Sequence, residues 1–198
     1  QRNAQIIDLP GTYSIYPKSR DEHIVMDVLA DKNSPDYPEL IVFVADASNL
    51  KRNLLLFSQV ADLKIPIIIA LNMMDIARQS GIEIAIDELA QKLGIQVIPI
   101  SARKQQGIDR LKEAILNSTS IPLQLPSIEV EAIAPELIHK IQDELNIEHP
   151  YVALQLAHQH EDMLFLSDEH KKKIQALSQE FDFHSQKSQA SETITRYN

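Results

Sequence analysis

The sequence predicts two modules of different fold class. Residues 1–120 are expected to form an α/β domain with a mostly parallel sheet and flanking helices, and residues 121–198 a small all-α helical bundle. In the first part, short and nearly continuous apolar runs alternate with amphipathic helical patterns, as is typical of strands buried on both faces of a parallel sheet. The second part carries helical patterns without a strand pattern. Two prolines in the segment 118–128 interrupt helical continuity and predict a linker.

Apolar spacing and helix-end signals place the individual elements. β-Branched apolar runs predict four strands in the first module, at residues 4–8, 40–45, 67–71 and 97–100. Amphipathic spacing predicts four helices between and after them, at residues 22–31, 50–63, 84–93 and 108–117. In the second module, helices are predicted at residues 137–145, 150–160, 167–181 and 190–197. Pro150 suits the first turn of one of these helices and Ser167 the cap of another.

Charge and cysteine content exclude several classes of function. The chain has 198 residues, with 28 Asp and Glu against 19 Lys and Arg, and a net charge of −9. Because phosphate backbones require a basic face, nucleic acid is excluded as the main partner. The absence of cysteine excludes a disulfide framework, a thiolate metal site and a cysteine nucleophile. No apolar run approaches the length of a bilayer span and no signal pattern is present, so we expect a soluble chain in a reducing compartment.

Polar residues follow each of the four predicted strands. The four groups are residues 8–11 (DLPG), Asp46, residues 72–75 (NMMD) and residues 101–102 (SA). The carboxyl ends of parallel strands meet at one edge of a sheet, where ligands bind in open α/β folds. Each group alone is explained as a cap for the following helix. Their order and spacing, however, are those of the late motifs of a GTPase domain, each in the strand-end context that such motifs require.

The residue types suit guanine recognition. The Asp75 carboxylate can accept both the N1–H and the exocyclic N2–H of guanine, an arrangement that adenine cannot satisfy. Asn72 would brace the loop and face the base, and the Ser101-Ala102 segment would offer a backbone N–H to guanine O6.

The first group suits the phosphate end of a nucleotide. Asp8 would hold the Mg²⁺ shell through water, and the Gly11 N–H would meet the γ-phosphate. Glycine at this place lets the backbone approach the phosphate closely.

These motifs resemble those of one family. The run from Asp8 to Pro17 is similar to the switch segment of the bacterial ferrous iron transport protein B family, as is Asn72-Met73-Met74-Asp75, where most GTPases have Lys after the Asn. The resemblance is strong over residues 4–117 and looser over the helical tail, which ends in the Arg196-Tyr197 motif.

The resemblance implies a P-loop GTPase-like domain that binds GTP or GDP with Mg²⁺, followed by a nucleotide-dissociation-regulating (GDI-like) helical domain. It implies a regulatory switch of an Fe²⁺ transporter, on the cytoplasmic face of the bacterial inner membrane, with GTP hydrolysis in the intact protein. The transporter's own membrane domain is then a partner, and a homo-oligomer is left open. The guanine-binding residues would be Asn72, Met73, Asp75, Ser101 and Ala102; the phosphate and Mg²⁺ switch residues would be Asp8, Pro10, Gly11 and Thr12.

One family element does not occur in this sequence. There is no Gly-x-x-x-x-Gly-Lys-Ser/Thr phosphate loop, whose backbone N–H groups and Lys hold the β- and γ-phosphates. We therefore expect a fragment with its N-terminal strands missing, which alone binds GTP weakly or not at all and does not hydrolyse it measurably. The missing family strand also leaves unpaired sheet edges.

Catalytic and metal-binding candidates are weaker. Thr12 stands where many GTPases carry a water-orienting Gln, which agrees with slow hydrolysis. Asp21 and Glu22 are candidates for water positioning or for ion pairs, and equally for acidic residues favoured at a helix N-terminus. His158, Glu161 and Asp162 gather possible metal ligands, although a solvated helix end is the favoured interpretation.

Two other functions stay open at this point. One is a different GTPase of the same superfamily, acting in ribosome assembly or tRNA modification, against which the acidic tail argues. The other is a non-catalytic interaction module that works through its helical bundle.

Overall fold

The computed structural model describes residues 4–12, 14–16, 20–118 and 133–197. Their contacts divide the chain into two compact units. Unit 1 comprises Gln1–Asp8 and Pro38–Pro126, and unit 2 comprises Leu9–Tyr37 and Ser127–Asn198. The segment after Asp8 therefore packs with the helical part of the chain, whereas the sequence-based division placed it with the sheet. The linker predicted at 118–128 lies almost entirely outside the described residues.

Unit 1 is built on a three-stranded parallel sheet. The strands are β1 (Ile41–Asp46), β2 (Ile67–Asn72) and β3 (Val97–Pro99), in the order β1-β2-β3. Ile41 pairs with Ile67 at the start of the first pair, and Asp46 pairs with Asn72 at its end. Because the strands are parallel and in this register, β1 and β2 end at the same edge of the sheet. β3 pairs with β2 from the other side.

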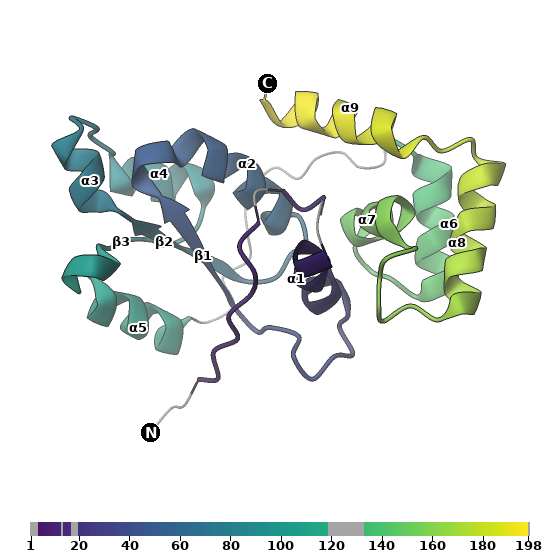
Figure 1. Ribbon diagram of the computed structural model, residues 1–198, viewed down its shortest axis with the longest axis horizontal. Coiled ribbons are helices and arrows are strands. Elements are labelled where there is room, and N and C mark those ends of the chain that lie inside the picture. The colour runs from purple at the N-terminus through teal and green to yellow at the C-terminus, as the bar shows by residue number, and fades with distance from the viewer. Residues whose placement is uncertain (1–3, 13, 17–19, 119–132, 198) are drawn as a thin grey trace. The chain divides into compact units, whose positions relative to one another are not determined.

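Helices cover both faces of this sheet (Figure 1). They are α2 (Leu50–Ala61), α3 (Met74–Gln79), α4 (Ile86–Leu93) and α5 (Ile108–Asn117). On one face, Phe43 and Ile69 pack with Phe57 of α2 and with apolar residues of α3 and α4. On the other face, Ala70 and Ile98 pack against α5. Burial on both faces explains why the β2 sequence is a continuous apolar run.

The strand predicted at residues 4–8 is wrong. These residues have no regular secondary structure and are all exposed, with Ile6 83% accessible. A strand is stable only when its backbone N–H and C=O groups are paired with a neighbour, and no described strand pairs with this segment. The sheet of the described residues therefore has three strands instead of four.

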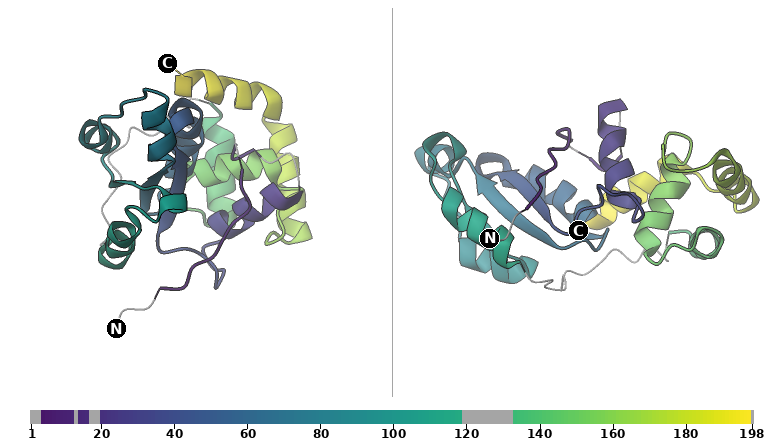
Figure 2. Two further views of the ribbon diagram at one scale, coloured as in Figure 1. Left: turned by 60° about the vertical axis from the view of Figure 1, so that its left-hand side comes forward. Right: turned by 90° about the horizontal axis from the view of Figure 1, so that it is seen from below.

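Unit 2 is helical. It contains α1 (Arg20–Ala30), α6 (Pro135–Leu145), α7 (Pro150–Gln159), α8 (Asp168–Glu180) and α9 (Ser185–Tyr197). Helices α6, α7 and α8 pack against one another, as the green segments of Figure 1 and Figure 2 show. α7 is buried over nearly its whole length, which makes it the centre of this unit. Ser167 caps α8 by accepting a hydrogen bond from the His170 N–H at 3.2 Å, as predicted.

The helices predicted from the sequence are observed to within a few residues, except that α9 begins at Ser185 instead of residue 190. Helix α3 (Met74–Gln79) was not predicted, because six residues are too few for a clear amphipathic repeat. In the part of the chain that the structure describes, no helix is both long enough and apolar enough to cross a bilayer.

Candidate nucleotide-binding site

Two loops of unit 1 meet at the carboxyl edge of the sheet because β2 and β3 are parallel neighbours. The first loop joins β2 to α3 and carries Asn72, Met73 and Asp75. Met73 has a left-handed backbone (φ 62°), which turns the chain sharply so that α3 begins at the next residue. The second loop follows β3, where the Ile100 N–H donates to the Leu71 carbonyl at 2.8 Å. The loops are thereby fixed side by side.

Side chains of the first loop bind the second loop directly. Asn72 Oδ1 accepts a hydrogen bond from the Ala102 N–H at 3.1 Å. The Ser101 hydroxyl donates to Asp75 Oδ1 at 3.0 Å. Lys104 Nζ lies 3.2 Å from the other carboxylate oxygen, Asp75 Oδ2. The structure therefore brings together the residues that the sequence singled out for guanine recognition, and it adds Lys104.

The second loop is closed on itself. Ser101 and Gln106 exchange two backbone hydrogen bonds, of 3.0 and 3.1 Å, with a single 3₁₀ turn (η2, Ala102–Lys104) between them. Gly107 follows with φ +77°, and a Cβ at that position would lie 2.3 Å from the Pro99 carbonyl oxygen. Glycine is therefore required at the residue that returns the loop to α5.

The Asp75 carboxylate is held in its charged form. Burial is the largest single influence and acts to raise its pKa, but the hydrogen bonds from Lys104 and Ser101 and the Lys104 charge together outweigh it, and the pKa lies below the ordinary value. An ionised carboxylate is an acceptor only, which is the state that a guanine edge with two N–H donors requires.

Lys104 had no distinct signal in the sequence. It stands one residue beyond the Ser-Ala-Arg run, among exposed polar residues. It stands at the end of the 3₁₀ turn, directly before the left-handed Gln105 (φ 56°), and from there its ammonium group reaches Asp75.

Asp46, the polar residue after β1, is a helix cap. Its carboxylate accepts hydrogen bonds from the Ser48 N–H at 2.8 Å and from the Ser48 hydroxyl at 2.7 Å, at the start of η1 (Ala47–Asn49). The capping interpretation of this residue is confirmed.

The phosphate-end candidates belong to two different units. Asp8 is an exposed residue of unit 1, whereas Pro10, Gly11 and Thr12 belong to unit 2. Thr12 Oγ1 donates to the Ser14 carbonyl at 2.6 Å and accepts from the Ser14 N–H at 3.2 Å, which closes a local turn. No described atom lies within 4 Å of a Cβ built at Gly11, so packing alone does not require glycine there. The phosphate and Mg²⁺ roles of these four residues stay predictions.

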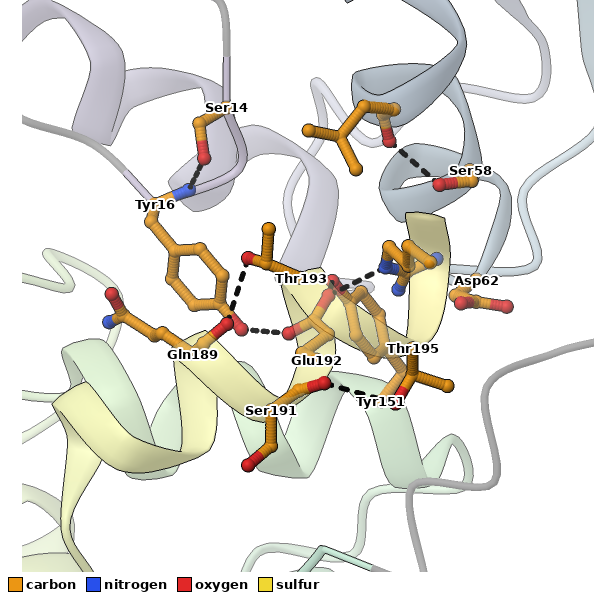
Figure 3. A network of polar contacts seen from close by, with 12 residues as sticks. Ser14, Tyr16, Ser58, Asp62, Tyr151, Gln189, Ser191, Glu192, Thr193 and Thr195 are labelled. Atoms are coloured by element: carbon orange, nitrogen blue, oxygen red, sulfur yellow. Dashed lines mark hydrogen bonds and ion pairs between the residues drawn. The ribbon is translucent and has the colours of Figure 1, made fainter. Parts of the chain in front are cut away.

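The segment after Gly11 is anchored to α9 within unit 2 (Figure 3). The Tyr16 hydroxyl donates to Glu192 Oε2, and the Tyr151 hydroxyl donates to Glu192 Oε1 at 2.7 Å. Arg196 Nε lies 2.8 Å from Glu192 Oε1, and its guanidinium lies 5.2 Å from the centre of the Tyr151 ring. Gln155 adds a hydrogen bond to the Tyr16 hydroxyl at 3.3 Å.

The carboxylate at the centre of this network is completely buried (0% exposed). Burial is the main cause that raises the pKa of Tyr16, and the Glu192 charge adds to it. The tyrosine hydroxyls therefore remain protonated donors, as a buried carboxylate requires.

Comparison with known proteins identifies the family. The sequence profile described as "Ferrous iron transport protein B" matches residues 1–115, more than half of the chain. The chain belongs to the ferrous iron transport protein B family. Over 114 residues it is 44% identical to the Fe(2+) transporter FeoB of Escherichia coli (strain K12). That match covers 56% of this chain and 14% of the relative, so the chain corresponds to a small part of the transporters it matches.

Solved structures of FeoB proteins share the fold of both units. The cytosolic domain of L. pneumophila FeoB is 31% identical with a TM-score of 0.68, covering 96% of this chain and 76% of that one. The mGMPPNP-bound NFeoB of S. thermophilus is 29% identical with a TM-score of 0.67, covering 96% of this chain and 74% of that one. The predicted fold class, a parallel sheet with flanking helices followed by a helical region, is confirmed. Nothing in these comparisons favours a ribosome- or tRNA-related GTPase or an interaction module.

The metal ligands suggested by the sequence, His158, Glu161 and Asp162, do not form a metal site among the described residues. His158 is partly buried: its ring nitrogens lie 2.7 Å from the Ser185 hydroxyl and 3.2 Å from the Ser188 hydroxyl, whereas Glu161 and Asp162 are exposed. Burial lowers the pKa of His158 to about 4. Among residues 4–12, 14–16, 20–118 and 133–197, no three His, Asp or Glu side chains gather as a metal site.

Asp21 and Glu22 lie in the first turn of α1, but their side chains are outside the described residues. Their proposed roles stay predictions.

Proposed function

We propose that this chain contains the guanine-recognition part of a GTP-binding regulatory domain of an Fe²⁺ membrane transporter. Its proposed location is the cytoplasmic face of the bacterial inner membrane, with the transporter's own membrane domain as partner and Fe²⁺ as the transported ion. The observation that supports this best is the pairing of Asn72 with Ala102 and of Asp75 with Ser101 at one sheet edge.

The chemistry of the site suits guanine. Asp75 presents an ionised carboxylate whose two oxygens can accept the N1–H and N2–H donors of the base. Adenine presents an acceptor at N1, which cannot donate a hydrogen bond to the Asp75 carboxylate, so adenine is expected to bind more weakly than guanine. The Ala102 N–H is directed at the Asn72 side chain, so guanine O6 can accept from it only when that hydrogen bond opens.

The phosphate end depends on groups that this chain supplies only in part. Asp8 offers a carboxylate oxygen of the kind that Mg²⁺ prefers, and Mg²⁺ when bound neutralises phosphate charge. Gly11 and Thr12 would lie near the γ-phosphate. GTP hydrolysis is proposed for the intact protein and not for this chain alone.

The helical unit is proposed to respond to whether GTP or GDP is bound, through the segment that follows Gly11. The segment that follows Gly11 ends in Tyr16, which is bonded to Glu192 on α9. A nucleotide-dependent shift of this segment therefore has to move with α9 or break its bond to a buried carboxylate.

Guanine selectivity tests this proposal directly. Titration of the ¹⁵N-labelled chain with GDP and with ADP should shift the amide signals of residues 72–75 and 101–106 for GDP only, with weak affinity. The Asp75→Asn variant should lose the response to GDP and gain one to xanthosine diphosphate, because the amide can donate to the additional carbonyl of xanthine. Equal responses to GDP and ADP would contradict the proposal.

A further inference from the structure

The guanine-recognition groups of unit 1 are satisfied by the chain itself. Asn72 Oδ1 accepts the Ala102 N–H, the bond proposed above for guanine O6. Lys104 Nζ lies 3.2 Å from Asp75 Oδ2, where a guanine N–H donor would bind. The Asn72 side-chain oxygen thus occupies the place of guanine O6, and the Lys104 ammonium occupies the place of a guanine N–H donor.

We infer that Lys104 is a built-in competitor of guanine for Asp75, which weakens nucleotide binding and accelerates nucleotide release. This inference rests on the proposed function, because it assumes that the Asp75 carboxylate binds the guanine base. Lys104 thereby becomes an affinity-determining residue of the base site in addition to the residues that contact guanine.

The geometry explains why Lys104, and not Ser101, is the competitor. Ser101 is buried and donates to Asp75 Oδ1 from the first residue of the closed loop, so it positions the carboxylate. The Lys104 side chain is 47% exposed and stands at the end of the 3₁₀ turn, while the Asp75 side chain is only 17% exposed. A flexible, half-exposed cation therefore covers a carboxylate that is otherwise largely enclosed, and it can leave without disrupting the loop.

The size of the competition follows from the exposure of the pair. Ion pairs with a solvent-exposed partner are weak, and loss of the competitor should raise nucleotide affinity about two- to fivefold. Salt screens such a pair, whereas a hydrogen bond from the neutral base to Asp75 responds less to salt. The advantage of a variant without the ammonium group should therefore shrink as ionic strength rises.

The test uses the chain itself and GDP. Lys104→Met keeps the side-chain stem and removes the charge, whereas Lys104→Arg keeps the charge. The Ala102 amide signal should report a two- to fivefold lower Kd for GDP in Lys104→Met than in the wild-type chain, and no such gain in Lys104→Arg. The gain should decline between about 50 and 300 mM salt. Lys112→Met removes an exposed lysine paired with Asp109 on α5 and serves as the control for net charge.

The outcomes separate the two claims. An unchanged or weaker affinity in Lys104→Met, or an equal gain in Lys112→Met, overturns the competitor role while leaving guanine recognition intact. A response to GDP that Asp75→Asn does not alter, or no response in any variant, overturns the proposed function and the competitor role together.

Discussion

Replacement of Gly107 by alanine should damage the guanine-recognition loop through two separate effects. The first is conformational, because φ +77° is a left-handed backbone that costs an alanine about 1–2 kcal/mol. The second is steric, because the new Cβ would lie 2.3 Å from the Pro99 carbonyl oxygen and 3.1 Å from Ile100 Cγ2. The nearest atom belongs to the backbone of β3 and cannot rotate away. Relief of this overlap requires a backbone shift, which costs about 1–3 kcal/mol more.

Gly81 provides a matched control in the same unit. Its φ is +73°, but no described atom lies within 4 Å of a Cβ built there. Gly81→Ala should therefore lower the stability of unit 1 by the conformational cost alone, about 1–2 kcal/mol. Gly107→Ala should lower the stability of unit 1 by about 2–5 kcal/mol, the sum of the conformational and steric costs.

Hydrogen exchange of β2 and β3 amides is the suitable assay, because it reports the opening free energy of unit 1 separately from that of unit 2. In addition, the Ala102 and Gln106 amide signals should shift in Gly107→Ala and stay in place in Gly81→Ala. Equal losses in the two variants would refute the reasoning, because they would show that the contact with Pro99 has no energetic consequence.

Three further predictions concern unit 2 and activity. The pKa of His158 is lowered to about 4 by burial, from an ordinary value of 6.5, so the unfolded chain binds the proton more readily. The stability of unit 2 is therefore complete above pH 6.5 and falls by about 3 kcal/mol as the pH drops to 4. Urea unfolding against pH measures this slope. The slope should flatten in His158→Phe and persist in the control variant His139→Phe, which changes an exposed position of α6. Tyr16→Phe and Tyr151→Phe should each lower the free energy of unfolding by about 1.5–3 kcal/mol, because each removes a hydrogen-bond donor to the buried Glu192 carboxylate. The double variant should deviate from additivity in urea unfolding, and strict additivity would argue against a shared network. Finally, phosphate release from GTP by this chain should equal the buffer background, because the sequence has no phosphate loop; multiple turnover would contradict this expectation.

Strands and helices whose apolar residues follow from burial could be predicted from the sequence. β2 and β3 are apolar because both faces of the sheet are covered, and α5 follows from Ile108 and Leu111 on its buried side. The strand expected at residues 4–8 has the same apolar character, yet it does not form. Apolarity indicates that a segment can be a strand, whereas pairing decides whether it is one.

Tertiary placement was less predictable. Asn72, Asp75 and Ser101 could be expected at one edge because parallel strands end there. Two other features depend on how distant segments meet: residues 9–37 pack with the helical unit, and Tyr16 reaches Glu192 across 176 positions. Lys104 depends on the path of a short turn, which residue spacing does not encode.

The internal bonds of the base site bear directly on how a nucleotide switch can work. If Asp75 and the Ala102 N–H had no partners without nucleotide, guanine would gain two full interactions and would leave slowly. Because Lys104 and Asn72 already fill these positions, guanine exchanges one set of bonds for another, and only the difference contributes to affinity. A small difference keeps the two states close in free energy, so that modest contributions from the phosphate end decide which one is populated. Weak base recognition is then a property that favours rapid exchange of nucleotide, and Lys104 is the residue through which it can be adjusted.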